Sequence, residues 1–472
     1  MEKAFDIIGE WFQPSDKSMR LKGRLSFDGT YNGSKLELWG QFEELDSTSS
    51  LIDIPLLQGI SLDGKMFTLV NCNNTGAKSR NRFQRHEFDI SHPIRRYRID
   101  YIIEDCLIDS VDDLVFNELQ TNFRHLDTWL EVSGFIKHEF SYEGVSEKYD
   151  IVYREPDAIK FKIDDDLSAE FVFRVDAEEG GLYGYETVIK QRVILVIKSK
   201  AYRNIESWKD IQYKFQNFLL LANLKDIQTL FTIVRSDNIR MLQDGWQGLP
   251  PAKYLKMHSA LMNEIPSKNE KEIRRMIFDY QDIQNNFESI ITAWFRKSQE
   301  LDPSFNLFFS SWYAKERVLE NSFLTLAQAI ETFHAKVFKN QKYIDENCIS
   351  FKIELLSILD EKYHEWIEAK SKCNEVTYKV IINRMIDSYA TESLLKRIGD
   401  TSQFSHDVTQ TRHWYTHYAS GLKNRAKRGA DVFPLIENLK SLMVCAILNE
   451  LGFEKEKIEF LIKEAYSTRI LH

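Results

Sequence analysis

The chain has 472 residues, and its 62 lysines and arginines against 71 aspartates and glutamates give a net charge of −9 at pH 7. Hydrophobic residues make up 43% and charged residues 28%, which excludes a disordered chain and suits two or three folded domains of about 150 residues each. The acidic balance argues against wholesale coating of nucleic acid, but it leaves room for a local basic site.

Neither a membrane segment nor a secretory leader is expected. The longest uninterrupted apolar run, residues 442–448, is far shorter than the roughly 18 residues that span a bilayer. The N-terminus has no positively charged start followed by a long apolar stretch, as a signal peptide would. The five cysteines are odd in number and contain no CxxC pair, so we expect a cytoplasmic protein with free thiols.

The front part of the chain is predicted to consist of strands. Fifteen of the 19 glycines lie at or before Gly248, which indicates turn-rich structure up to that point. Alternating stretches at 19–29 and 30–42 are joined by Asn32-Gly33, a strong hairpin signal because both residues tolerate positive φ. Further strands are expected at 65–72, 96–103, 129–142, 158–163, 169–175, 187–199 and 226–235, with one helix at 205–224.

After Pro250-Pro251 the hydrophobic residues recur at the helical period. Long helices are predicted at 271–300, 319–338, 351–367, 380–398 and 433–452. The predicted fold class is therefore α+β, a β-rich N-terminal region followed by an all-α helical bundle. We expect the β-rich region at residues 1–240, a helical connector at 241–302 and the helical domain at 303–472.

The helical half contains one strongly basic segment. Positive and negative residues balance over 301–472, so the whole charge of −9 lies in residues 1–300. Residues 411–429 hold five lysines and arginines, no acidic residue and three interleaved aromatic residues. Cations that meet phosphates, beside rings that stack on bases, are what a single-stranded RNA site needs. The predicted RNA-binding residues are Lys423, Arg425, Lys427, Arg428 and Tyr415. A solvated charge run with core aromatic residues is the plainer interpretation.

Arg412 and His417 form the pattern R-x4-H. An arginine can hold a phosphate, and a histidine can move a proton near neutral pH. Together they suffice for RNA cleavage without a metal, in which the ribose 2′-OH attacks the adjacent phosphorus. The same pattern also describes a surface arginine and a partly buried histidine. His413 and His417 share a helix face and could bind a metal, but no third ligand has recognisable spacing, so no metal or cofactor is predicted.

Arg412, His413 and the residues up to His417, followed by the basic segment and further helices, resemble a HEPN domain. This helical bundle carries R-x4–6-H near the start of a late helix in its ribonuclease members. Residues 326–338 are similar to the HEPN helix whose acidic residue faces the motif, which implies that role for Glu331. Many members have a small polar residue such as Asn where this chain has His413, so the resemblance leaves open which histidine is catalytic.

The resemblance extends to the N-terminal region. Its GEWFQP, LKGRLSFDG and LELWGQF stretches are similar to the N-terminal β-rich domain of ApeA-type proteins. These are bacterial anti-phage defence proteins with a C-terminal HEPN nuclease. The resemblance implies a sensing and regulatory β-rich region that responds to a phage-derived trigger, and a HEPN nuclease domain that pairs with a second copy.

The resemblance also implies a reaction. Arg412, His417 and His413 would be catalytic and Glu331 supporting, in a metal-independent cleavage of RNA that leaves 2′,3′-cyclic phosphate and 5′-OH ends. A tRNA is the first substrate to test, and abortive infection is the expected consequence for the cell. HEPN folds also serve without catalysis, so the alternative function is an interaction or RNA-binding adaptor, or a receptor for a phage component.

Overall fold

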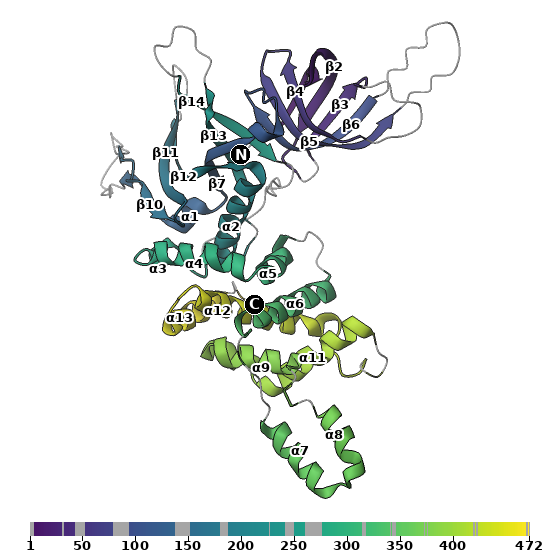
Figure 1. Cartoon of the computed structure of the whole chain (residues 1–472). Helices are drawn as coiled ribbons and strands as arrows, with labels where there is room; N and C mark the ends of the chain where they lie inside the picture. The colour runs from purple at the N-terminus through teal and green to yellow at the C-terminus, as the bar shows by residue number, and fades with distance from the viewer. Residues whose placement is uncertain are drawn as a thin grey trace, which may run out of the picture. The chain divides into compact units, whose positions relative to one another are not determined.

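The computed structural model divides the chain into two compact units. The first, here called the β unit, comprises Met1–Leu219, Ile227–Arg274 and Asp279–Glu288; the second, the helical unit, comprises Leu220–Asp226, Arg275–Phe278 and Ser289–His472. The structure describes residues 4–30, 33–42, 52–78, 94–136, 152–179, 187–225, 227–240, 250–259, 276–313, 318–339, 341, 346–371, 373–374, 376–418, 421, 423–468 and 471. Figure 1 shows both units with most of their elements labelled.

The β unit begins with a six-stranded antiparallel barrel. Its strands are β1 Phe5–Gln13, β2 Asp16–Phe27, β3 Lys35–Trp39, β4 Ile54–Ser61, β5 Met66–Lys78 and β6 Ile94–Glu104. They follow the order β6-β3-β2-β1-β4-β5, and a further pairing of β5 with β6 closes the ring. The predicted hairpin of β2 and β3 is confirmed by their antiparallel register, while Asn32 of its turn lies outside the described residues.

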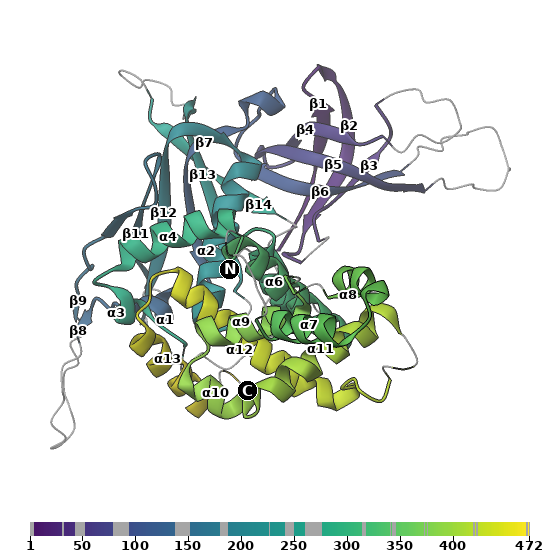
Figure 2. The same cartoon turned by 60° about the horizontal axis from the view of Figure 1, so that its bottom comes forward.

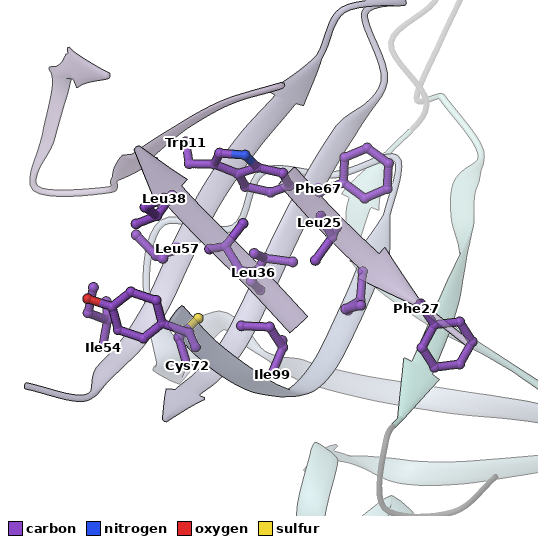
Figure 3. Close-up of a cluster of buried hydrophobic side chains, with 13 residues drawn as sticks. Trp11, Leu25, Phe27, Leu36, Leu38, Ile54, Leu57, Phe67, Cys72 and Ile99 are labelled. Carbon is purple, nitrogen blue, oxygen red and sulfur yellow. The ribbon is translucent and has the colours of Figure 1, made fainter. Parts of the chain in front are cut away.

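Apolar side chains from all six strands fill the barrel (Figure 3). Trp11 on β1 is fully buried and lies against Phe67 of β5, with ring centroids 6.3 Å apart. Gly59 on β4 is the register partner of Trp11. A Cβ atom on Gly59 would come within 2.2 Å of the Trp11 ring, so only glycine leaves room for the indole here.

The same sheet continues beyond the barrel from β6. It contains η1 Val111–Asp113 and α1 Leu126–Leu130 in its connections and has the strands β7 Val115–Phe123, β10 Ile159–Lys162, β11 Leu167–Glu179, β12 Thr187–Asn204, β13 Thr229–Arg240 and β14 Ala252–Ser259. Their order is β10-β11-β12-β7-β13-β14-β6, and every pair is antiparallel. A separate short pair is formed by β8 Phe135–Ile136 and β9 Val152–Tyr153.

Helix α2, Ile205–Asn223, packs on this sheet through buried polar bonds. The Trp208 Nε1 donates to the Phe116 carbonyl oxygen at 3.0 Å. The Gln212 amide donates to the hydroxyls of Thr121 on β7 and Thr232 on β13, at 2.9 Å each. These bonds satisfy groups that the apolar surroundings would otherwise leave without water.

Two expectations for the β-rich part are wrong. Residues 129–142 were predicted to form one strand, but Trp129 and Leu130 belong to α1, and only Phe135–Ile136 is a strand among the described residues there. The connector 241–302 was predicted to be helical, but Ala252–Ser259 is strand β14, because β13 and β6 offer it pairing partners on both sides. Tertiary pairing of this kind overrides local propensity.

The long helix predicted at 271–300 is divided. Its described part forms α3 Tyr280–Ile283 and α4 Phe287–Glu300, separated by a turn. Asp279 begins α3 with a capping box. Its side chain accepts a hydrogen bond from the Asp282 N–H, and the Asp282 side chain accepts one from the Asp279 N–H. A cap satisfies N–H groups at a helix start, so it fixes a boundary that the apolar periodicity does not reveal.

The helical unit confirms the predicted bundle, although the helices predicted at 351–367 and 380–398 are each divided in two. Besides most of α4, its helices are α5 Ser304–Tyr313, α6 Leu319–Val337, α7 Glu346–Ile358, α8 His364–Lys370, α9 Tyr378–Tyr389, α10 Glu392–Ile398, α11 Thr401–His417, α12 Phe433–Glu450 and α13 Lys455–Ser467, with the short η2 Glu361–Tyr363 and η4 Gly429–Val432. The apolar run 442–448 lies in α12 and is entirely buried, because α12 has α6, α9, α10 and α13 around it. Figure 2 shows α6, α9, α11 and α12 in one bundle. Among the described residues, no helix has the length and apolarity needed to cross a membrane.

The cysteines depart from the expectation of free thiols. Cys348 in α7 and Cys373 after α8 form a disulfide, with Cα atoms 5.3 Å apart. The two helices pack on each other as a hairpin and bring these distant cysteines within bonding reach. Cys72, Cys106 and Cys445 are free and buried.

We expect Gly59→Ala to destabilise the barrel, because the added methyl group meets the buried Trp11 ring. Overpacking of this kind costs about 1–3 kcal/mol in the free energy of unfolding. Urea unfolding followed by circular dichroism measures the change. The matched control is Gly421→Ala, where a Cβ atom meets nothing within 4 Å. Equal stability of the two variants would contradict the packing described for Trp11.

Candidate active site in the helical unit

The motif lies at the C-terminal end of α11. Asp400 caps the helix start, and its side chain accepts a bond from the Gln403 N–H at 2.9 Å. Tyr418 ends the helix in the left-handed conformation, directly after His417. The resemblance had placed R-x4-H near a helix start, and this is wrong because the Asp400 cap begins the helix well before the motif.

The Arg412 guanidinium is held by groups from two other helices. Its Nη2 donates to the Glu331 carboxylate of α6 at 2.7 Å, so Glu331 faces the motif as the resemblance implies. Its Cζ lies 4.6 Å from the centroid of the Tyr378 ring, at the start of α9. The buried Tyr378 hydroxyl donates to the Ala327 carbonyl oxygen at 3.0 Å, which fixes that ring against α6.

These contacts leave Arg412 able to bind an anion. A guanidinium has five N–H donors, so one bond to Glu331 leaves others for a phosphate. The Arg412 side chain is 26% exposed, which gives solvent access to the group without freeing it to move as a surface side chain does. Stacking on a tyrosine ring also preserves the planar orientation of the fork.

Two histidines follow Arg412 on the same helix. His413 is half-buried and His417 is exposed, and their ring centroids are 6.4 Å apart. Burial lowers the pKa of His413 below its usual 6.5, and the nearby Arg412 and His417 side chains lower it further. His413 is therefore mainly uncharged at neutral pH and can accept a proton. Within the described part of the chain, no group of three or more His, Cys, Asp or Glu side chains could hold a metal ion.

The basic segment that follows α11, residues 423–428, is attached to that helix through Lys427. Its backbone N–H donates to the Thr411 hydroxyl at 3.0 Å, and its Nζ lies 3.3 Å from the Asp407 carboxylate. The side chains of Lys423, Arg425 and Arg428 are exposed. The predicted cations thus divide into one anchoring residue, Lys427, and three that face solvent.

The aromatic residues of the motif divide in the same way. Tyr415 is only 8% exposed, and its ring lies 6.3 Å from that of Phe323 on α6. The prediction that Tyr415 stacks on a base therefore does not fit the structure, because its ring belongs to the core of the bundle. Tyr418 is exposed, and its ring lies 5.5 Å from that of the half-buried Trp414. These two rings are better placed to meet a base.

Family models match both parts of the chain. The model for ApeA N-terminal domain 1 matches residues 6–294, which is more than half of the sequence. The chain belongs to the ApeA family. A second model, the Apea-like HEPN domain, matches residues 324–457. No curated protein and no solved structure matches the chain.

These matches confirm the family expected from the sequence, that of ApeA-type anti-phage defence proteins with a C-terminal HEPN domain. The HEPN match includes Glu331, Arg412, His413 and His417. The contact between Glu331 and Arg412 thus lies inside the HEPN domain of this ApeA-family chain.

Sequence reasoning missed Tyr378, Asp407 and Thr411 in this ApeA-family site. Tyr378 is one of 20 tyrosines and follows Thr377, whose hydroxyl caps α9. Asp407 and Thr411 are ordinary polar residues of α11 until the fold brings Lys427 to them. Asp407 and Thr411 are four residues apart and precede Arg412, so both lie near one helix face. This spacing was the only sign in the sequence that they belong to the site.

The lowered pKa of His413 yields a direct test. Arg412→Ala removes a nearby positive charge, so we expect the pKa of His413 to rise toward 6.5. A proton NMR titration of the histidine rings, assigned with His413→Gln, measures this. Arg397→Ala, which changes an arginine stacked on Tyr466, is the control and leaves the pKa of His413 where it was. A wild-type pKa of His413 at or above 6.5 would contradict the described environment.

Proposed function

We propose that this chain is a metal-independent endoribonuclease of anti-phage defence, with Arg412, His413 and His417 as its catalytic residues. The observation that carries the proposal is the fixed Arg412 guanidinium, held by Glu331 and stacked on Tyr378, on a helix that also carries the half-buried His413 and the exposed His417. A positioned cation and two proton-transfer groups are the parts that cleavage by the 2′-OH requires.

The proposed reaction assigns one task to each side chain. The neutral His413 ring accepts the proton of the ribose 2′-OH as that oxygen attacks the adjacent phosphorus. Arg412 stabilises the negative charge that builds on the phosphoryl oxygens. His417 donates a proton to the 5′-oxygen as the P–O bond breaks. The products are a 2′,3′-cyclic phosphate and a 5′-OH end.

The proposed substrate is RNA with exposed bases, and a tRNA anticodon loop is the first to test. Lys423, Arg425 and Arg428 would contact its phosphates, and Trp414 and Tyr418 would stack on its bases. One copy of the site offers few cations, so we propose that two HEPN domains pair and contribute both motifs to one groove.

We propose that the β unit decides when the nuclease acts. The whole charge of −9 lies in residues 1–300, whereas residues 411–429 are basic. Binding of a phage-derived trigger to the β unit would release the nuclease in the cytoplasm and lead to abortive infection. Such restraint suits an enzyme whose activity harms its own cell.

The direct test is incubation of the purified full-length protein with total cellular RNA in EDTA, followed by end-group mapping. Arg412→Ala and His417→Ala should each lower the cleavage rate about 10²–10⁴-fold, because each removes a group that acts in the transition state. The control is Arg397→Ala, which changes an arginine outside the site. Circular dichroism verifies that every variant is folded.

The full chain is needed because the helical unit includes short segments from earlier in the sequence. The Ile277 N–H donates to the Ala222 carbonyl oxygen at 2.7 Å, and the Trp312 indole donates to the Leu224 carbonyl oxygen at 2.9 Å. A fragment beginning at residue 301 lacks these partners. Full phage protection by a folded His417→Ala variant would contradict the nuclease and favour the adaptor function.

A further inference from the structure

The hairpin formed by α7, η2 and α8 exposes large apolar side chains. Phe351 is 60% exposed and Trp366 is 64% exposed, and Ile353, Ile358 and Tyr363 are also exposed. No described residue of α7 is fully buried, and α8 buries only Ile367. In Figure 1 the hairpin projects away from α9 and α11. A helix that is apolar on most sides is normally covered.

The exposed apolar area is a large part of what one partner buries in a protein interface. Exposed aromatic and branched side chains of this number present on the order of several hundred Å² of apolar surface. A standard interface buries about 800 Å² on each partner. The packing of α7 on α8 holds the hairpin together, and Cys348 and Cys373 meet at its base, so a preformed arm displays the surface.

The charge of the hairpin indicates which partner it fits. Residues 346–371 contain three lysines and six acidic residues, a net charge of −3. Two such hairpins placed against each other would repel. The basic segment of the same unit is complementary, because residues 423–428 carry four cations and no acidic residue. Exposed Tyr418 precedes this segment and exposed Phe433 follows it, which adds apolar surface.

We propose that the α7–α8 hairpin is a dimerisation arm that docks on the basic segment of a second copy of this chain. Each chain carries both the arm and its complement, so two reciprocal contacts close a twofold dimer. The arm then contacts Arg425 and Arg428 of the partner, so RNA reaches these two side chains only when the arm is displaced. This inference rests on the proposed pairing of HEPN domains, but not on RNA cleavage.

Sedimentation of the full-length chain across a range of concentrations tests the arm. The double variant Phe351→Ser/Trp366→Ser should weaken the dimer at least about tenfold, the effect of losing about 1.4 kcal/mol from the interface. The matched control is Phe460→Ser, since Phe460 on α13 is 55% exposed in the same unit. It should leave the dimer unchanged. Both test positions face solvent, so folding is preserved.

A charge exchange identifies the docking surface. Glu365→Lys/Glu368→Lys on the arm and Arg425→Glu/Arg428→Glu on the basic segment should each weaken the dimer about tenfold, because each places like charges together. Combining the four changes should restore it, since opposite charges meet again.

Two results would overturn the proposal, and they are distinguishable. A wild-type chain that is monomeric at every concentration would contradict the proposed pairing of two copies, and with it the arm. A wild-type dimer unaffected by the arm variants, or not restored by the charge exchange, would remove only the arm. Neither outcome depends on whether the protein cleaves RNA.

Discussion

The ion pair between Arg412 and Glu331 joins α11 to α6 and fixes the side chain that the proposed reaction requires. Such a half-exposed pair contributes only about 0–1 kcal/mol to folding, so its main effect is on position. The Tyr378 ring holds the other face of the guanidinium, and its hydroxyl is bonded to α6. Three helices therefore meet at one cation. The surrounding bundle, which packs around the buried α12, fixes their relative positions.

Much of the architecture follows from periodicity. Alternating apolar residues identified the barrel strands β2 and β3, and the helical period identified α6 and α12, because each element buries one face or is buried all round. The sequence did not reveal β14, since an isolated run of eight residues acquires strand structure only when β13 and β6 pair with it. The disulfide was missed for the same reason: Cys348 and Cys373 are 25 residues apart and meet only through the hairpin.

The candidate site too could be predicted only in part from the sequence. Arg412, His417 and Glu331 could be selected from the sequence because the HEPN resemblance assigns them by motif, and the fold does bring Glu331 to Arg412. The sequence could not show which aromatic side chains face solvent. That depends on the fold, which puts Tyr415 on the core side of α11 and Tyr418 after the helix end. The support from Tyr378 depends on the packing of α9 against α11, which no local pattern encodes.

Positioning of the guanidinium, and not charge alone, is the central claim. The most direct measurement is therefore the RNA cleavage rate of Arg412→Lys beside Arg412→Ala and the wild type. Lysine keeps the charge but lacks the planar fork that contacts Glu331, stacks on Tyr378 and still offers donors to a phosphate. We predict that Arg412→Lys loses most of the activity and falls within about tenfold of Arg412→Ala. A lysine variant that cleaves RNA at nearly the wild-type rate would contradict the claim, because a point charge would then suffice.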